Sequence, residues 1–301
     1  MAPHPASAPV PKTGGLLPIL VACNGRSGTS LLMELLGTSP RITLGRQPPF
    51  EDRVLSALLV QSEGLARGGA PFQGLMQSLT GGGLVGLGAL NEAPYLNPPG
   101  AIPLHLDLFA VSWERASARM VEAHRLQTNS TPTHYAEKVP ESLFGLLKGR
   151  FRVARILYPI RDPRDQWISA EAMGQREGHG NLRPPGGDGE SRIPGFVQAL
   201  PVIRRRLSLL AAGPSAAVFP VSYEKLVGNV QGTASEIGAW LGVPLHPERL
   251  NLQSAFALGH RTAPSGGATT ERWRQEMSAA EQAWFRDHVG DLLTAVGLAV
   301  E

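Results

Sequence analysis

The 301-residue chain contains one cysteine, Cys23, and no long apolar run. A single cysteine excludes an intrachain disulfide and favours a reducing compartment. No stretch approaches the ~18 consecutive apolar residues that a membrane-spanning helix needs. Residues 1–15, MAPHPASAPVPKTGG, lack the apolar core of a secretory signal, and their Pro, Ala and Ser content predicts a flexible leader. Together these absences favour a cytoplasmic protein without a membrane span.

Lysine is also scarce, because the 28 basic residues include only Lys12, Lys138, Lys148 and Lys225. Arginine, which makes up the rest, is the better planar clamp for phosphate-like groups, although a GC-rich genome explains such an excess equally well. The net charge of +3 gives no indication of bulk nucleic-acid binding. No cluster of His, Cys and Asp has the spacing of metal ligands, so no metal is expected.

Apolar runs and helical patterns alternate along the chain, which predicts a parallel sheet flanked by helices. Hydrophobic residues make up 42% of the chain, enough for a sizeable core. The expected strands span residues 16–22, 41–44, 134–138, 153–160 and 216–221. The expected helices span residues 28–38, 51–66, 104–127, 140–149, 162–175, 195–211, 229–241 and 278–296.

We expect these elements to form one domain over residues 16–301, with a three-layer α/β fold like that of the P-loop NTPases and a central parallel sheet. Two stretches, 80–100 and 177–195, are rich in Gly and Pro or in polar residues, and they interrupt the alternation. Long irregular stretches in a compact domain are either mobile linkers or lids over a site. We expect both to be irregular insertions that roof an acceptor pocket.

The residues after the first expected strand, CNGRSGTS at 23–30, form a Gly-rich turn that enters a helix. Such a turn directs backbone N–H groups and the positive end of the helix dipole at one point, where an anion can bind. Donors or a close backbone approach are expected from Gly25, Arg26, Ser27, Gly28, Thr29 and Ser30. Thr29 falls where a Walker A loop carries its lysine, which disfavours a conventional Mg–ATP kinase. The alternative is a plain strand–turn–helix capped by Ser or Thr.

A second strand-to-helix turn lies in RILYPIRDPRDQWISA at 155–170. The expected strand ends at Arg161, and Ser169 lies about two helical turns further along, on a face near that of Arg161. An arginine and a serine that converge in this way can hold a second phosphate group. The alternative is an ordinary capped helix on which Arg164 and Asp165 are solvated.

The pair of turns, GRSGTSLL at 25–32 followed by YPIRDPRDQWISA at 158–170, resembles the sulfotransferases that use 3′-phosphoadenosine 5′-phosphosulfate (PAPS). The resemblance implies that the first turn binds the 5′-phosphosulfate and that Arg161 and Ser169 bind the 3′-phosphate. Two separated anion sites suit a donor with two separated phosphate groups, which ATP is not.

Three later segments resemble the same family, so that the resemblance covers nearly the whole chain. EKVPESLFGLL at 137–147 implies that Lys138 lies near the transferred sulfuryl group. The segment at 221–243, which begins VSYEKLV, implies that Tyr223 lies on the adenine side. The segment at 260–281 resembles a late loop that closes over the 3′-phosphate. Its residues expected at that phosphate are Ser265, Gly266 and Gly267.

Sulfuryl transfer depends on positioning and on cationic stabilisation of the leaving phosphate oxygen, which the resemblance assigns to Arg26 and Lys138 without a metal. A general base must also take the proton of the acceptor. Glu51, in LGRQPPFEDRVL at 44–55, resembles the Glu of the tyrosylprotein branch and is the expected base. Against this, Gln47 stands where the glycosaminoglycan branch has its Glu. The histidine alternatives are His105, His124, His134, His179 and His260.

The expected function is transfer of the sulfuryl group from PAPS to a hydroxyl or amine by in-line displacement, with release of 3′-phosphoadenosine 5′-phosphate (PAP). The acceptor is expected to be a small molecule or a carbohydrate, and a homodimer is compatible with this function. Asn91, Glu92 and Tyr95 are candidate acceptor-pocket residues. Two alternatives stay open: a nucleotide or small-molecule kinase, and a non-catalytic nucleotide-binding module that has lost the base.

Overall fold

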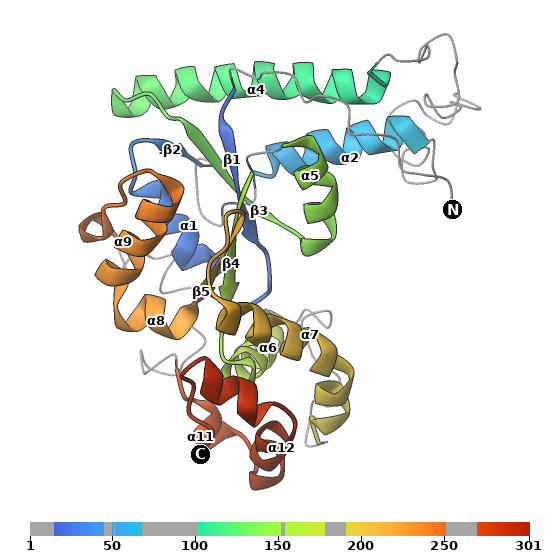
Figure 1. The fold of residues 1–301 in the computed structure, drawn as a ribbon, viewed down its shortest axis with the longest axis vertical. Coiled ribbons are helices and arrows are strands. Elements are labelled where there is room, and N and C mark those ends of the chain that lie inside the picture. Colours follow the sequence, from blue (N-terminus) through green and yellow to red (C-terminus); the bar gives the residue numbers. More distant parts are fainter. Residues whose placement is uncertain are drawn as a thin grey trace. The chain divides into compact units, whose positions relative to one another are not determined.

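The computed structural model describes residues 15–44, 50, 52–67, 102–151, 154–177, 191–250 and 270–301. Within these ranges five strands form one sheet in the order β2-β3-β1-β4-β5 (Figure 1). The pairs β2–β3 and β4–β5 are both parallel. The strands are β1 (Leu17–Ala22), β2 (Ile42–Thr43), β3 (His134–Val139), β4 (Arg155–Ile160) and β5 (Val218–Ser222). The predicted α/β class, with a central parallel sheet flanked by helices, is confirmed.

The helices follow the predicted periodicity closely. The helices that match a prediction are α1 (Thr29–Gly37), α2 (Val54–Arg67), α4 (Leu104–Thr128), α5 (Phe144–Arg150), α6 (Pro163–Glu177), α7 (Ile193–Ala212), α9 (Val230–Leu241) and α12 (Ala279–Ala295). The short helices α8 (Tyr223–Gly228) and α11 (Trp273–Glu276) were not predicted, because six or four residues are too few for a period to show. Two 3₁₀ turns, η2 (Glu141–Leu143) and η4 (Pro247–Arg249), complete the described elements.

Some predicted features lie outside the described residues. They include residues 1–14 of the leader, the whole of the stretch 80–100, and residues 178–190 of the second stretch. The described contacts divide the chain into two compact units. The first comprises residues 1–20, 40–46 and 50–154, and the second comprises residues 21–39, 47–49 and 155–301. That residues 16–301 act as a single domain stays a prediction.

In the first unit, α2 packs along α4, as Figure 1 shows. The Trp113 ring of α4 contacts the rings of Tyr135 and Phe151, each with centroids 5.7 Å away. The buried stripe of α4 therefore contains Phe109 and Trp113, four residues apart. Leu108 and Val111, which also keep a helical spacing, are 40% and 42% exposed instead. The helix was predicted correctly, but the sequence does not show which of its two apolar stripes is buried.

In the second unit, the core lies among α6, α7, α11 and α12 (Figure 1). The Phe196 ring contacts the rings of Trp167 and Phe285, with centroids 4.8 Å away in both cases. A capping box of Ser278 and Glu281 begins α12. This packing holds α6, the helix that follows β4. No helix in the described part of the chain is both long and apolar enough to cross a membrane.

Candidate anion-binding site

The turn between β1 and α1 has the backbone shape that the sequence predicts for an anion-binding loop. Gly28 is the N-cap residue of α1 and has φ = 87°, a left-handed conformation that glycine adopts readily. Arg26 also has a positive φ, 62°. Because Gly28 has no side chain, it cannot itself cover the N–H groups of the first turn of α1. The loop therefore presents these N–H groups and the positive end of the α1 dipole.

The inside of this loop is braced by groups that the sequence analysis did not single out. The N–H and the hydroxyl of Ser27 donate to the Asn24 carbonyl, at 3.2 and 2.5 Å. The Asn24 side-chain oxygen accepts from Nη2 of Arg206 on α7, at 2.8 Å. The Ser27 hydroxyl hydrogen is thus used within the loop, in the hydrogen bond to the Asn24 carbonyl. Asn24 and Arg206 lie 182 residues apart, and no sequence signal connects them.

The second predicted segment meets the loop directly. Arg26 Nε donates to Ser169 Oγ at 3.0 Å, and Arg161 Nη1 donates to the Arg26 carbonyl at 3.3 Å. Gln166 Nε2 of α6 donates to the Gly25 carbonyl at 2.5 Å. Arg161 and Ser169 are both buried. The structure therefore brings the two segments together within the second unit, and Arg26 connects them.

Tyr223, at the start of α8, touches both segments. A Cβ atom on Gly28 would lie 2.4 Å from Cδ2 of the Tyr223 ring, so the ring lies against the backbone of the loop. The Arg161 guanidinium lies 4.8 Å from the centroid of the same ring, a cation–π distance. The interpretation of Arg26, Gly28, Arg161, Ser169 and Tyr223 as one site is thus consistent with their positions.

The β4–α6 turn is built on buried charges. Arg164 and Asp165 are both 0% exposed, so the alternative that they are solvated is wrong. Asp162 accepts from Nε and Nη2 of Arg164, at 2.9 and 2.7 Å. The backbone N–H of Asp162 donates to a Glu224 oxygen at 2.8 Å, which fixes the residue directly after Arg161. Burial raises the pKa of Glu224, and burial together with the Asp162 charge raises the pKa of Asp165.

One residue expected to take part in transfer, Lys138, belongs to the first unit. Lys138, on β3, is 4% exposed, and its Nζ lies 5.8 Å from the centroid of the Phe50 ring. Glu51, the expected base, lies outside the described residues. The same holds for Ser265, Gly266, Gly267, Gln47, Asn91, Glu92, Tyr95, His179 and His260.

A buried carboxylate beside Lys138 was missed by the sequence analysis. Glu137 on β3 accepts hydrogen bonds from the backbone N–H groups of Leu55 and Ser56, at 2.7 and 2.9 Å. It also accepts from the hydroxyls of Ser56 and Tyr135, at 2.5 and 2.8 Å. Glu137 therefore caps the N-terminus of α2 from a distant strand. Burial raises the pKa of Glu137, although these four hydrogen bonds lower it.

The histidine alternatives have structural contacts where they are described. His124 Nε2 lies 3.0 Å from the Pro40 carbonyl, and His134 Nδ1 lies 2.9 Å from the Thr133 hydroxyl. His105 is buried, and burial, with the nearby Arg150 charge, lowers its pKa. Among the described residues, no group of three His, Cys, Asp or Glu side chains could hold a metal ion.

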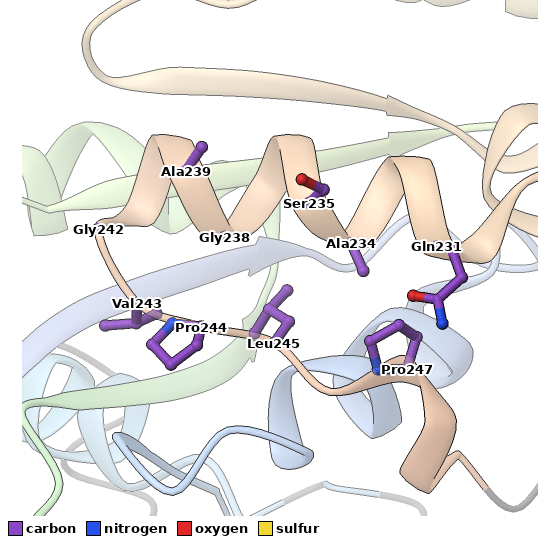
Figure 2. A pocket seen from close by; sticks show the side chains of 10 residues that line it. All are labelled: Gln231, Ala234, Ser235, Gly238, Ala239, Gly242, Val243, Pro244, Leu245 and Pro247. Carbon is purple, nitrogen blue, oxygen red and sulfur yellow. The ribbon is translucent and has the colours of Figure 1, made fainter.

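A cavity of about 470 Å³ lies between α9 and the segment that follows it (Figure 2). Ala234, Ser235 and Ala239 line it from the helix, and Pro244 and Leu245 line it from the segment. Its lining contains no cationic side chain and none of the predicted site residues. This cavity is therefore not the anion-binding site.

The sequence matches the model of the sulfotransferase family over residues 18–247. Similar solved structures include the sulfotransferase domain of the Synechococcus PCC 7002 olefin synthase, with 16% identity, 96% of each chain covered and a TM-score of 0.46. A sulfotransferase from Alicyclobacillus acidocaldarius has 16% identity, with 93% of this chain and 96% of that chain covered and a TM-score of 0.42. Retinol dehydratase in a complex with retinol and PAP has 14% identity, with 94% and 82% covered and a TM-score of 0.43. No curated protein matches the sequence. Because the family model spans most of the chain, the chain belongs to the sulfotransferase family.

Proposed function

We propose that the protein transfers a sulfuryl group from PAPS to a hydroxyl or amine acceptor and releases PAP. The observation that carries this proposal is the pair of hydrogen bonds by which Arg26 connects the α1 loop to Ser169 and Arg161. A donor with a phosphosulfate and a separate 3′-phosphate needs two adjacent cationic sites. The helix N-terminus of α1 suits the first group, and the Arg161–Ser169 segment suits the second.

The roles of the donor-site residues are those that the family resemblance implies, and this arrangement supports them. The loop from Gly25 to Ser30 binds the 5′-phosphosulfate, and Arg161 with Ser169 binds the 3′-phosphate. The Tyr223 ring, which lies against Gly28 and Arg161, supports the adenine side. Only the family resemblance supports the assignment of Ser265, Gly266 and Gly267 to the binding of the 3′-phosphate.

The transfer step is an in-line displacement at sulfur. The acceptor oxygen or nitrogen forms a bond to sulfur while the bond from sulfur to the bridging phosphate oxygen breaks, and Glu51 takes the acceptor proton. Arg26 and Lys138 stabilise the charge that develops on the leaving phosphate. No metal is required by this step. The acceptor is a small molecule or a carbohydrate.

Thermal melts with PAP, ATP–Mg and GTP test the donor. A ligand at 100 times its Kd stabilises the folded protein by about 2.7 kcal/mol, so a true donor-site ligand raises Tm clearly. We expect PAP to do so. Stabilisation by ATP–Mg but not by PAP would instead support the kinase alternative.

Labelled PAPS with a panel of alcohols, phenols, amines and carbohydrates then tests catalysis. Binding of PAP without transfer to any acceptor would support the non-catalytic alternative. Glu51→Gln should abolish transfer and leave PAP binding intact, whereas Arg161→Ala should weaken PAP binding strongly. Full activity of Glu51→Gln would remove Glu51 as the base.

A further inference from the structure

A short segment near the C-terminus is held on the turn that carries Arg161. The Asp165 carboxylate, in the first turn of α6, accepts from the backbone N–H of Glu271 at 2.6 Å and from that of Trp273 at 3.0 Å. Glu271 has φ = 60°, in the left-handed region that is unfavourable for a non-glycine residue. Because Asp165 accepts the Glu271 N–H, it helps to hold this unfavourable conformation.

Arg164 makes a second attachment between the same two segments. Its guanidinium is bidentate to Asp162 and lies 3.6 Å from the centroid of the Trp273 ring. Its Nη2 also donates to the Ala299 carbonyl at 2.5 Å. A planar guanidinium can make the in-plane bonds and the face contact at once, which a lysine ammonium cannot. Arg164 and Asp165, which are adjacent in the first turn of α6, therefore contact three residues near the C-terminus. These residues are Glu271, Trp273 and Ala299.

This attachment lies between the two residues assigned to the 3′-phosphate. Asp165 follows Arg161 by four residues and precedes Ser169 by four residues, so Asp165 and Ser169 are neighbours along one face of α6. A shift of the first turn of α6 would move Ser169 relative to the Arg26 Nε that it contacts at 3.0 Å. All of these residues belong to the second unit.

We propose that Asp165 is a positioning residue for the 3′-phosphate site. By holding Glu271 and Trp273 on the first turn of α6, it keeps Arg161 and Ser169 at the separation that the phosphate requires. It does not touch the donor itself. This inference rests on the proposed PAPS-dependent function, because it assigns Arg161 and Ser169 to the 3′-phosphate.

Calorimetric titration of Asp165→Asn with PAP and with adenosine 5′-phosphate tests the proposal. An Asn side chain has nearly the same shape, but its NH₂ group would face one of the two N–H groups that Asp165 accepts. We expect the Kd of PAP to rise at least tenfold and the Kd of adenosine 5′-phosphate, which has no 3′-phosphate, to change less than twofold. In turnover assays the KM of PAPS should rise with kcat nearly unchanged. Asp291→Asn, an exposed substitution on α12, is the matched control and should change neither Kd.

The outcomes separate this inference from the function on which it rests. Wild-type protein that does not bind PAP would refute the proposed function. If wild type binds PAP but Asp165→Asn binds it equally well, or loses both ligands equally, the positioning role is wrong and the function stands.

A measurement on the wild-type protein covers the case in which the variant does not fold. Saturating PAP should slow amide hydrogen exchange at Glu271 and Trp273, because a 3′-phosphate on Arg161 and Ser169 would stabilise the turn that holds these amides. Adenosine 5′-phosphate should not slow it. Equal exchange with and without PAP would overturn the proposal.

Discussion

Gly28 is the position in the candidate anion-binding loop where a single added methyl group should lower the stability most. Its φ of 87° is unfavourable for alanine, and an added Cβ would lie 2.4 Å from Cδ2 and 2.9 Å from Cε2 of Tyr223. The Tyr223 ring is not free to move away without loss, since it also contacts the Arg161 guanidinium at 4.8 Å.

The cost of Gly28→Ala has two separable parts. The left-handed conformation costs an L-residue about 1–2 kcal/mol. Overpacking against the ring adds about 1–3 kcal/mol. A smaller entropy of the unfolded chain returns about 0.4–1 kcal/mol. The net loss of stability is therefore about 1–5 kcal/mol, and with a fall in Tm of roughly 2–4 °C per kcal/mol we expect Tm to drop by several degrees.

Gly25→Ala is the matched control for the thermal melts. Gly25 lies in the same loop, has no positive φ, and a Cβ there would meet nothing within 4 Å. Its Tm should stay within about 2 °C of wild type, since a Gly→Ala change at a permitted conformation is neutral or slightly stabilising. Gly25→Ala should still weaken the binding of PAP if the 5′-phosphate of PAP approaches that residue closely.

A double-mutant cycle with Tyr223→Ala separates strain from overpacking. Removal of the ring removes the clash but leaves the unfavourable φ, so the two substitutions should couple by about 1–3 kcal/mol. If Gly28→Ala has the same Tm as Gly25→Ala and wild type, neither the unfavourable φ nor the overpacking against Tyr223 costs stability, and the reasoning is refuted.

Three further predictions concern buried polar groups. Glu137→Gln should lower the stability by about 1–3 kcal/mol, since an amide cannot accept all four hydrogen bonds. Burial raises the pKa of Glu137 above its usual value of 4.5. The stability that this shift contributes to the wild type is therefore fully present below pH 4.5, and it is lost as the pH rises through the pKa of Glu137 in the folded protein. A gap in Tm between wild type and Glu137→Gln that widens with rising pH over this window would contradict the sign. Ser169→Ala removes the acceptor of Arg26 Nε, and calorimetry should show a roughly tenfold weaker Kd for PAP, a loss of about 1.4 kcal/mol; an unchanged Kd would exclude Ser169 from the site. Asp162→Asn leaves the buried Arg164 without its counter-ion, and breaking a buried pair costs about 3–5 kcal/mol, so the urea midpoint should fall markedly; an unchanged midpoint would show that the pair is dispensable.

The strands and helices were largely predictable because their signals are local. Parallel strands covered on both faces are continuous apolar runs, as in LPILVA of β1, and such runs are visible without a structure. The Gly-rich turn after β1 and the Arg–Pro turn after β4 were visible for the same reason. Their residue types and spacing predict two anion sites from the sequence alone.

The buried polar network was not predictable, because its partners are far apart in the chain. Asp165 and Trp273 are separated by 108 residues, and Glu137 and Ser56 by 81. A charged residue in the first turn of a helix, such as Asp165, or on a strand, such as Glu137, is the same residue type in the sequence whether it is solvated or buried. Only its distant partners decide between the two, and Asp165 and Glu137 proved to be buried.

The sequence by itself determined the fold class, the two strand-to-helix turns proposed to bind anions and the family resemblance, because each depends on residue types at short, regular spacing. The tertiary structure alone decided how those turns are joined. It placed Arg26 on Ser169, the Tyr223 ring against Gly28, and the C-terminal segment on Asp165. These contacts arise from packing between segments distant in the chain, and packing is a property of the folded molecule rather than of any local pattern.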